Sequence, residues 1–203
     1  MATALEIRHR TLADFLAWEE QQPERCERVG GVIRMMTGGT VAHNRITRNC
    51  ARALENRLER SDCEVFTSDL KVVTPGEDVM YPDVLVVCGT IADKATRLET
   101  PVVVAEVLSE STAERDHGRE RWAYQTIPSL QHYILIDQNE PAAEVASRAD
   151  DGSWRSVVHR GLDDRVQLQA LGIEIGLDEI FARVTFAPAS ADAPEARSTD
   201  RSG

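Results

Sequence analysis

Two acidic residues stand where the pattern of residues 81–137 predicts buried β-strands. Asp83 directly precedes the apolar run 84–88, and Glu106 lies inside the apolar run 102–108. A strand that is apolar on both sides of a position is usually buried on both faces of a sheet. A buried carboxylate without a partner costs several kcal/mol or is neutralised. This conflict between burial and charge constrains the chain more than any other feature.

Antiparallel pairing of the two runs would resolve the conflict with a metal ion. If Cys88 pairs with Pro101, Asp83 lies opposite Glu106, with Cβ atoms roughly 4.5–5.5 Å apart. Two carboxylates that close favour a cation or a shared proton between them, and a hard divalent ion prefers oxygen ligands. Taken singly, Asp83 is equally well explained as a turn residue at the start of a strand, and Glu106 as a solvent-facing residue of an edge strand.

The residues after Glu106 predict a β-α-β unit. Ser111-Thr112-Ala113-Glu114 has the capping-box pattern that begins a helix. The helix should span about 112–125 and end near Ile127-Pro128, because the residue before proline is driven out of the helical region. A strand at 131–137 then returns parallel to the first strand, so that the helix covers one face of the sheet.

These motifs together resemble those of the Uma-two family, a bacterial group of restriction-endonuclease-like proteins in the PD-(D/E)XK nuclease superfamily. The resemblance rests on PD before a strand, EVLS in a second strand, ST with Asp116 five residues after Ser111, and Y-x-x-I-P-S-L before a strand that ends in ILID. It covers about residues 11–181. It implies an α/β fold with a restriction-endonuclease-like mixed β-sheet core, flanking helices and an N-terminal β-hairpin.

Length and composition predict one folded domain. With 203 residues of which 42% are hydrophobic, the chain can form a single core, which we place at 1–186. Residues 187–203 are poor in apolar side chains and are expected to be disordered. The other expected elements are a helix at 11–20, a hairpin at 26–36 around Gly30-Gly31, a helix at 43–60, a strand at 64–73, a loop at 75–80, a hairpin at 143–159, a strand at 166–170 and a short helix at 177–181.

The resemblance also implies a set of site residues. Asp83 and Glu106 would hold Mg²⁺ or Mn²⁺, and Glu27 on the hairpin would take part in catalysis near the metal. His43, at the start of the second helix, matches a histidine of the family and is assigned to substrate binding. From the residues alone, Glu27 is equally well an exposed strand residue, and a lone histidine is more often structural.

The sequence departs from the family at a position that carries catalysis. In the family a lysine on the helix after the second strand orients or deprotonates water, whereas this chain has Glu120 there, between Arg119 and Arg121. Arginine can neutralise a phosphate, but its pKa above about 12 makes it a poor proton acceptor. We therefore count Glu120 among the catalytic positions and Arg119 among the substrate-binding ones, with the catalytic step left open.

The distribution of charge gives conflicting indications about nucleic-acid binding. Arg45, Arg48 and Arg52 recur at 3–4-residue steps on the polar side of the second helix, where they could contact phosphates, although such a row is more often a solvated surface. The formal net charge of −11 argues against a nucleic-acid partner, because such proteins usually carry a basic patch. A local basic groove on an acidic protein would reconcile the two.

Three functions stay open. A metal-dependent endodeoxyribonuclease is favoured, followed by a nuclease-like fold that binds nucleic acid or a protein partner without cutting, and by a metal-using hydrolase of a smaller phosphoester. G-x-S-x-G, H-E-x-x-H and G-x-G-x-x-G motifs are absent from the sequence.

The four cysteines lack C-x-x-C spacing and are expected to be buried free thiols. With no signal-peptide core or apolar run of roughly 18 residues, we expect a cytoplasmic protein without a membrane partner, and a homodimer stays possible.

Overall fold

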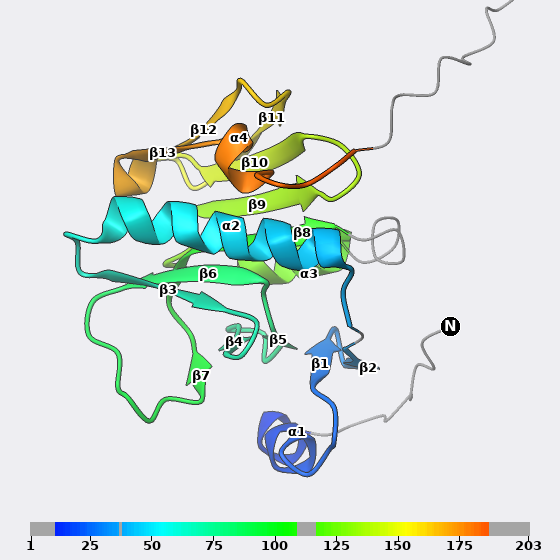
Figure 1. The fold of residues 1–203 in the computed structure, drawn as a ribbon. Helices are drawn as coiled ribbons and strands as arrows, with labels where there is room; N and C mark the ends of the chain where they lie inside the picture. The colour runs from blue at the N-terminus through cyan, green and yellow to red at the C-terminus, as the bar shows by residue number, and fades with distance from the viewer. Residues whose placement is uncertain (1–10, 37, 109–116, 187–203) are drawn as a thin grey trace, which may run out of the picture.

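The computed structural model of the chain describes residues 11–36, 38–108 and 117–186. The predicted capping box at 111–114 and the predicted disordered tail at 187–203 lie outside the described residues. Within them the protein is a mixed α/β structure in which helices flank β-sheets (Figure 1). This confirms the predicted fold class.

A six-stranded mixed sheet forms the centre of the molecule, with the order β11-β10-β9-β8-β6-β3. β8 and β9 pair in parallel and the other neighbours are antiparallel. The chain passes from β8 to β9 through α3 (His117–Gln125), so the predicted β-α-β unit is confirmed. The strands are β3 (Cys63–Thr67), β6 (Val84–Cys88), β8 (Pro101–Leu108), β9 (His132–Asp137), β10 (Ala142–Arg148) and β11 (Trp154–Arg160).

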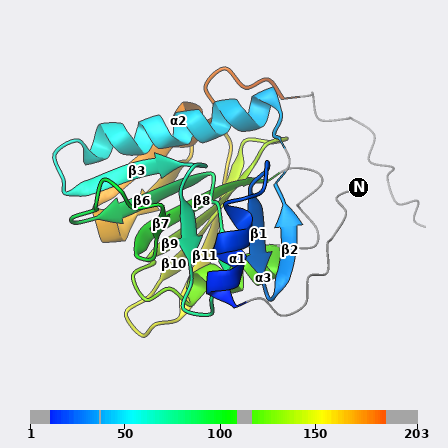
Figure 2. The same ribbon diagram turned by 90° about the horizontal axis from the view of Figure 1, so that it is seen from below.

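Helices cover the two faces of this sheet. α2 (Val41–Leu58) lies along one face and α3 lies behind the other (Figures 1 and 2). The apolar stripe of α2 is buried, because the 3–4-residue spacing of its members places them on one side of the helix; it consists of Ile46, Cys50, Ala53, Leu54 and Leu58. No helix in the described ranges is both long and apolar enough to cross a membrane.

Successive residues of the central strands face opposite helices, as the pleat of a strand requires. Val103 and Ala105 pack in the core below α2, whereas Val104 packs with Leu85 and Tyr124 in the core below α3. Both faces of β6 and β8 are therefore buried, as the unbroken apolar runs predicted.

A second sheet of five short strands carries the N-terminal hairpin, in the order β2-β1-β5-β4-β7. The predicted turn at Gly30-Gly31 is confirmed, since φ is +57° and +76° there, values that glycine adopts without strain. α1 (Leu12–Glu19) begins with the Thr11–Asp14 capping box and buries Phe15 against this sheet. The strands are β1 (Cys26–Val29), β2 (Val32–Met35), β4 (Lys71–Val73), β5 (Val79–Met80) and β7 (Arg97–Leu98).

The structure corrects two predictions of local structure. The strand expected at 64–73 is two strands in different sheets, because the chain turns at Ser68 with φ of +28°, and the loop expected at 75–80 includes β5. The strand expected at 166–170 is β12 (Arg165–Leu168) followed by a 3₁₀ turn, η1 (Gln169–Leu171). It pairs with a strand that was not predicted, β13 (Ile173–Gly176). The closing helix is confirmed as α4 (Leu177–Ile180).

The cysteine prediction is half wrong. Cys26 and Cys50 are buried free thiols as expected, but Cys63 and Cys88 form a disulfide. The reason is register: β3 pairs with β6 so that Cys63 lies directly opposite Cys88. A separation of 25 residues hides that pairing from any spacing rule.

Candidate active site

Asp83 and Glu106 come together at one end of the β6–β8 pair. Val84 pairs with Ala105 and Leu85 with Val104, and the same register extended by one residue sets Asp83 beside Glu106. The register shifts between Val86 and Val87. The predicted pairing is therefore correct beside the acids and wrong at the Cys88 end.

The two carboxylates are held by backbone N–H groups of the opposite segment. Glu106 accepts from Asp83 itself, and Asp83 accepts from the residue after Glu106. The Asp83 N–H donates to Glu106 Oε2 at 3.2 Å, and the Val107 N–H donates to Asp83 Oδ2 at 2.8 Å. The Tyr124 hydroxyl on α3 donates to Glu106 Oε1 at 3.0 Å. Both acids are thereby oriented by groups that favour their charged form.

Burial and like charge make this an unfavourable place for an uncompensated anion. Burial raises the pKa of Glu106 well above its ordinary value, and the charges of Asp83, Glu120 and Glu27 raise it further. A nearby cation would favour the ionised form of Glu106 and offset that repulsion. The electrostatics therefore suit a bound cation.

Glu27 joins the hairpin to the segment before Asp83. The Tyr81 N–H donates to Glu27 Oε1 at 2.8 Å. This bond crosses from β1 to the residue that precedes Pro82-Asp83. Because the charge of Glu27 also raises the pKa of Tyr124, its carboxylate acts on the same site.

His43 contacts the site from the first turn of α2. Its Nε2 lies 3.1 Å from Asp83 Oδ2, and both side chains are about one-fifth exposed. The hydrogen bond to Asp83 raises the pKa of His43, and burial opposes that shift. Thr40 caps the helix by accepting from the His43 N–H at 3.1 Å, which fixes the turn that holds the imidazole.

On α3 the three charged residues diverge. The charge of Glu120 raises the pKa values of Glu106 and Tyr133, so its carboxylate acts on the acidic site. Arg121 turns away, with Nη1 at 2.7 Å from Glu144 Oε1 and Nη2 at 2.6 Å from Ser156 Oγ. Arg119 is exposed.

Lysine is scarce in this chain, which has two against 21 arginines. Lys71 is buried, with Nζ at 2.6 Å from Glu19 Oε2, and the Tyr81 hydroxyl donates to the other oxygen of Glu19 at 2.7 Å. Lys94 is exposed in the segment between β6 and β7. In the described part of the chain, no lysine contacts Asp83 or Glu106.

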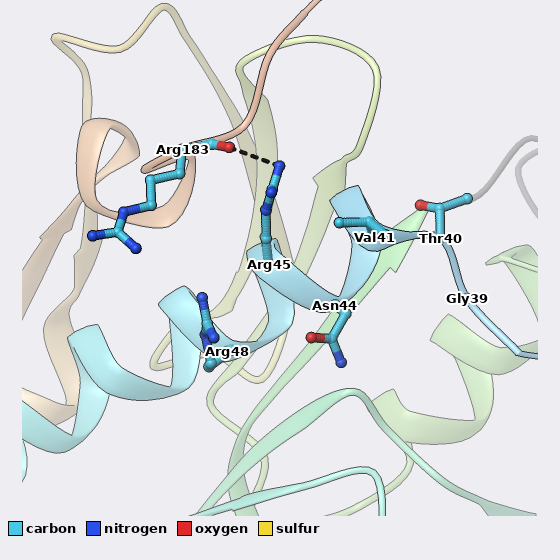
Figure 3. Close-up of a pocket in the computed structure, with 7 residues that line it drawn as sticks. All are labelled: Gly39, Thr40, Val41, Asn44, Arg45, Arg48 and Arg183. Atoms are coloured by element: carbon cyan, nitrogen blue, oxygen red, sulfur yellow. Dashed lines mark hydrogen bonds between the residues drawn. The ribbon is translucent and has the colours of Figure 1, made fainter.

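The arginines predicted on α2 are exposed, and two of them line a cavity. Arg45 and Arg48 are joined there by Arg183, from the segment after α4 (Figure 3). Arg52 does not line it and donates to Asn49 Oδ1 at 3.4 Å. Sequence reasoning missed Arg183, which lies 138 residues from Arg45. It also missed the role of Tyr124, although the Y-x-x-I-P-S-L motif contains that tyrosine.

Comparison with known proteins identifies the family. The sequence profile of Uma2, described as "Putative restriction endonuclease", matches residues 12–179. The chain belongs to the Uma2 family. It is 33% identical over 175 residues to an uncharacterized protein of Synechocystis sp., covering 85% of this chain and 92% of that one. A second Synechocystis protein, also uncharacterized, is 36% identical over 148 residues, covering 71% of this chain and 84% of the relative.

A solved structure shares the Uma2 fold seen here. The crystal structure of a "putative nuclease belonging to DUF820" from Anabaena variabilis superposes with a TM-score of 0.71 at 18% identity. The match covers 85% of this chain and 98% of that one. This match shows that the two chains share a fold, and the matching family model is described as a putative restriction endonuclease. Nucleases of this kind generally use divalent metal ions.

The donors at the site fit such an ion. Among the described residues, the one group of three His, Cys, Asp or Glu side chains with ligand atoms all within 4.8 Å is Asp62, Cys63 and Cys88, and two of those three form the disulfide. Asp83 and Glu106 instead offer a pair of hard oxygen donors. Mg²⁺ is typically held by one or two carboxylates together with waters and substrate phosphates, so two acids suffice for this class of site.

Proposed function

We propose that this Uma2 protein is a metal-dependent endonuclease that hydrolyses phosphodiester bonds in DNA. The observation that carries the proposal is the reciprocal bonding of Asp83 and Glu106 in a poorly solvated place, where Glu27 and Glu120 add further negative charge. Such an arrangement destabilises the metal-free protein and favours a divalent cation.

In this mechanism Asp83 and Glu106 would hold Mg²⁺ or Mn²⁺. When bound, such an ion lowers the pKa of a coordinated water and offsets charge on the phosphate and on the leaving oxygen. The Tyr124 hydroxyl fixes one oxygen of Glu106, and the Val107 N–H fixes one oxygen of Asp83. These bonds set the direction of both carboxylates before substrate arrives, which lowers the reorganisation that catalysis requires.

His43 and the arginines would act on the substrate side. The imidazole holds Asp83 Oδ2 at the point where α2 begins, and Arg45 and Arg48 follow on the next two turns. A guanidinium can bind two phosphate oxygens at once. Glu27 keeps the hairpin close to the site through Tyr81, while the exposed Arg52 and Arg119 would contact the DNA strand.

Cleavage assays with a metal requirement test the proposal. Single- and double-stranded DNA are incubated with Mg²⁺ or Mn²⁺, and with EDTA as the metal-free reference. We expect weak cleavage that depends on the metal and disappears in Asp83→Asn, because this change keeps the shape of the side chain but removes its charge. The exposed Asp93→Asn, which removes the same charge away from the site, is the matched control. Equal cleavage by wild type and Asp83→Asn would overturn the proposed site.

The second candidate is a nuclease fold that binds nucleic acid without cutting it. The observation that favours it is Glu120, an anion at the position where the family has a lysine, in a chain that has no lysine at the site among its described residues. A further carboxylate repels the incoming phosphate. No lysine of the described site supplies the proton-transfer group that the family uses, although His43 beside Asp83 is a side chain able to transfer protons.

Glu120→Lys distinguishes the two candidates. If the protein is a nuclease limited by this substitution, Glu120→Lys should raise the cleavage rate, by up to about 10²–10⁴-fold. Glu120→Gln separates relief of repulsion from supply of a proton-transfer group, since glutamine does only the first. If wild type, Glu120→Gln and Glu120→Lys all bind DNA and none cleaves it, the non-cutting function is favoured.

A further inference from the structure

A cavity of about 540 Å³ lies between the start of α2 and the segment that follows α4. Figure 3 shows three arginines at its wall, from two parts of the chain that are far apart in sequence. Its volume falls in the range of small-molecule sites and exceeds that of a single ion. We call it the three-arginine pocket; it is lined by Gly39, Thr40, Val41, Asn44, Arg45, Arg48 and Arg183.

The pocket concentrates positive charge in an acidic protein. Three of its lining residues are arginines and none is acidic, although the chain as a whole has a net charge of −11. Elsewhere arginines pair with acids, as Arg57 does with Glu179 and Arg121 with Glu144. Over the described residues, no carboxylate lies within 4.0 Å of the three pocket guanidinium groups. Like charges gathered without a counter-charge favour binding of an anion, and guanidinium groups match phosphate in geometry.

Arg183 is held in the pocket by a strained turn. Its φ is +65°, a conformation that residues with a Cβ rarely adopt. Two hydrogen bonds from the buried Asn49 amide, to Ile180 O at 3.1 Å and Ala182 O at 2.8 Å, tie this segment to α2. Arg45 Nη1 also donates to the carbonyl of Arg183 at 3.1 Å. Strain kept in place by several bonds is characteristic of functional positions.

The pocket adjoins the candidate active site. Gly39 forms part of its wall, and a Cβ at that position would approach His43 Nδ1 to 3.0 Å. The other ring nitrogen of His43 contacts Asp83. The His43 imidazole therefore lies between Gly39 of the pocket wall and Asp83 of the acidic site.

We propose that the three-arginine pocket binds a phosphate group of the DNA strand whose neighbouring phosphodiester lies at Asp83 and Glu106. The proposal rests on the proposed function only for the identity of the strand. It adds Arg183 as a substrate-binding residue and assigns a cationic subsite beside the acidic one. Such a subsite would allow a chain with a large negative charge to bind nucleic acid.

Binding measured in EDTA tests the pocket apart from cleavage. Fluorescence anisotropy follows a labelled 20-nucleotide DNA, single-stranded and duplex, at several salt concentrations. Arg183→Gly should weaken binding about tenfold, the size of one charge-assisted contact, and should lower the salt slope by about one. Glycine suits the positive φ of this position, so the melting temperature of Arg183→Gly should equal or exceed that of wild type. Arg183→Ala keeps the Cβ and its backbone strain, so it should lose the same affinity without this gain in stability. The Arg45→Gln/Arg48→Gln double variant should weaken binding further, and Arg60→Gln, which removes the same charge outside the pocket, should change nothing.

A free nucleotide separates two sources of phosphate. Deoxyadenosine 5′-monophosphate is titrated by calorimetry into wild type and Arg183→Gly. If the nucleotide binds tightly to wild type, and Arg183→Gly loses nucleotide binding but keeps DNA binding, the pocket takes a small phosphoester. The proposal that the pocket binds a DNA strand is then overturned. Unchanged DNA binding in the pocket variants, or no DNA binding by wild type, overturns it as well. Asp83→Asn should abolish cleavage and keep DNA binding in EDTA, so failure of the proposed nuclease activity leaves the binding result interpretable.

Discussion

Glu106 illustrates how a single carboxylate can be costly for stability and useful for function. It is half-buried within β8, its two oxygens accept from Asp83 N–H and the Tyr124 hydroxyl, and burial with the charge of Asp83 raises its pKa. When the folded pKa of an acid exceeds the unfolded pKa, the folded state binds the proton more tightly. Stability from this group is therefore fully present below about pH 4.5, its unfolded pKa, and is lost as pH rises through the folded pKa.

Replacing Glu106 by Gln should stabilise the metal-free protein at neutral and higher pH. The amide keeps an oxygen for Asp83 N–H and removes the repelled charge, so the melting temperature in EDTA should rise at pH 8 and change much less at pH 4. Thermal unfolding at both pH values, with exposed Glu55→Gln as the matched control, measures this effect. A melting temperature at pH 8 that falls or stays level would contradict the electrostatic account.

The same variant tests the metal site. Mg²⁺ or Mn²⁺ at about one hundred times its Kd should stabilise wild type by about 2.7 kcal/mol, and the increase should be lost in Glu106→Gln and in Asp83→Asn. Glu55→Gln should keep it. If millimolar ions leave the wild-type melting curve unmoved, Asp83 and Glu106 do not form a preformed site.

Strand β6 connects two features of the molecule. Asp83 of the acidic site precedes its first residue, and Cys88 at its far end is bonded to Cys63 of β3. The disulfide closes a segment of 25 residues that includes β4 and β5. Such a loop restricts the unfolded chain and stabilises the folded state by about 3 kcal/mol in the chain-entropy account.

Reducing this bond should destabilise the fold. Urea unfolding with and without a reducing agent should differ by about 3 kcal/mol, and the Cys63→Ser/Cys88→Ser double variant should be insensitive to the reductant. A thiol assay on the denatured protein should count two free thiols before reduction and four after it. Four thiols in the unreduced protein would show that the bond does not form. Disulfides are uncommon in reducing compartments, so the expected cytoplasmic location stays a prediction.

At the scale of the whole molecule, the acidic site and the three-arginine pocket lie beside the same helix, α2, as separate clusters of negative and positive charge. The first turn of α2 contacts the acidic site through His43, and Arg45 and Arg48 of the same helix line the three-arginine pocket. A net charge of −11 repels DNA at long range, where salt screens it over about 8–10 Å. If the protein binds DNA as proposed, the attraction must come from contacts at short range. The three-arginine pocket and a metal ion at the acids would then carry more weight here than in a basic nuclease.

The sequence alone determined the local elements and the pair of acids. The apolar stripe of α2, the Gly30-Gly31 turn and the unbroken runs around Asp83 and Glu106 are patterns within a few residues of one another. Local periodicity and turn chemistry specify such features directly. The order of short motifs also indicated the family, and with it the mixed sheet.

Tertiary structure alone decided which distant residues meet. The shifted register at Val86/Val87, the Cys63–Cys88 bond, the division of residues 64–73 between two sheets and the placement of Arg183 beside Arg45 all join segments that are remote in sequence. A one-residue change of register redirects a whole strand, and residue types do not encode which strand becomes the neighbour. The acidic site was predictable because its two strands follow one another in the apolar pattern, whereas the pocket depends on a segment that lies 138 residues from Arg45 in the sequence.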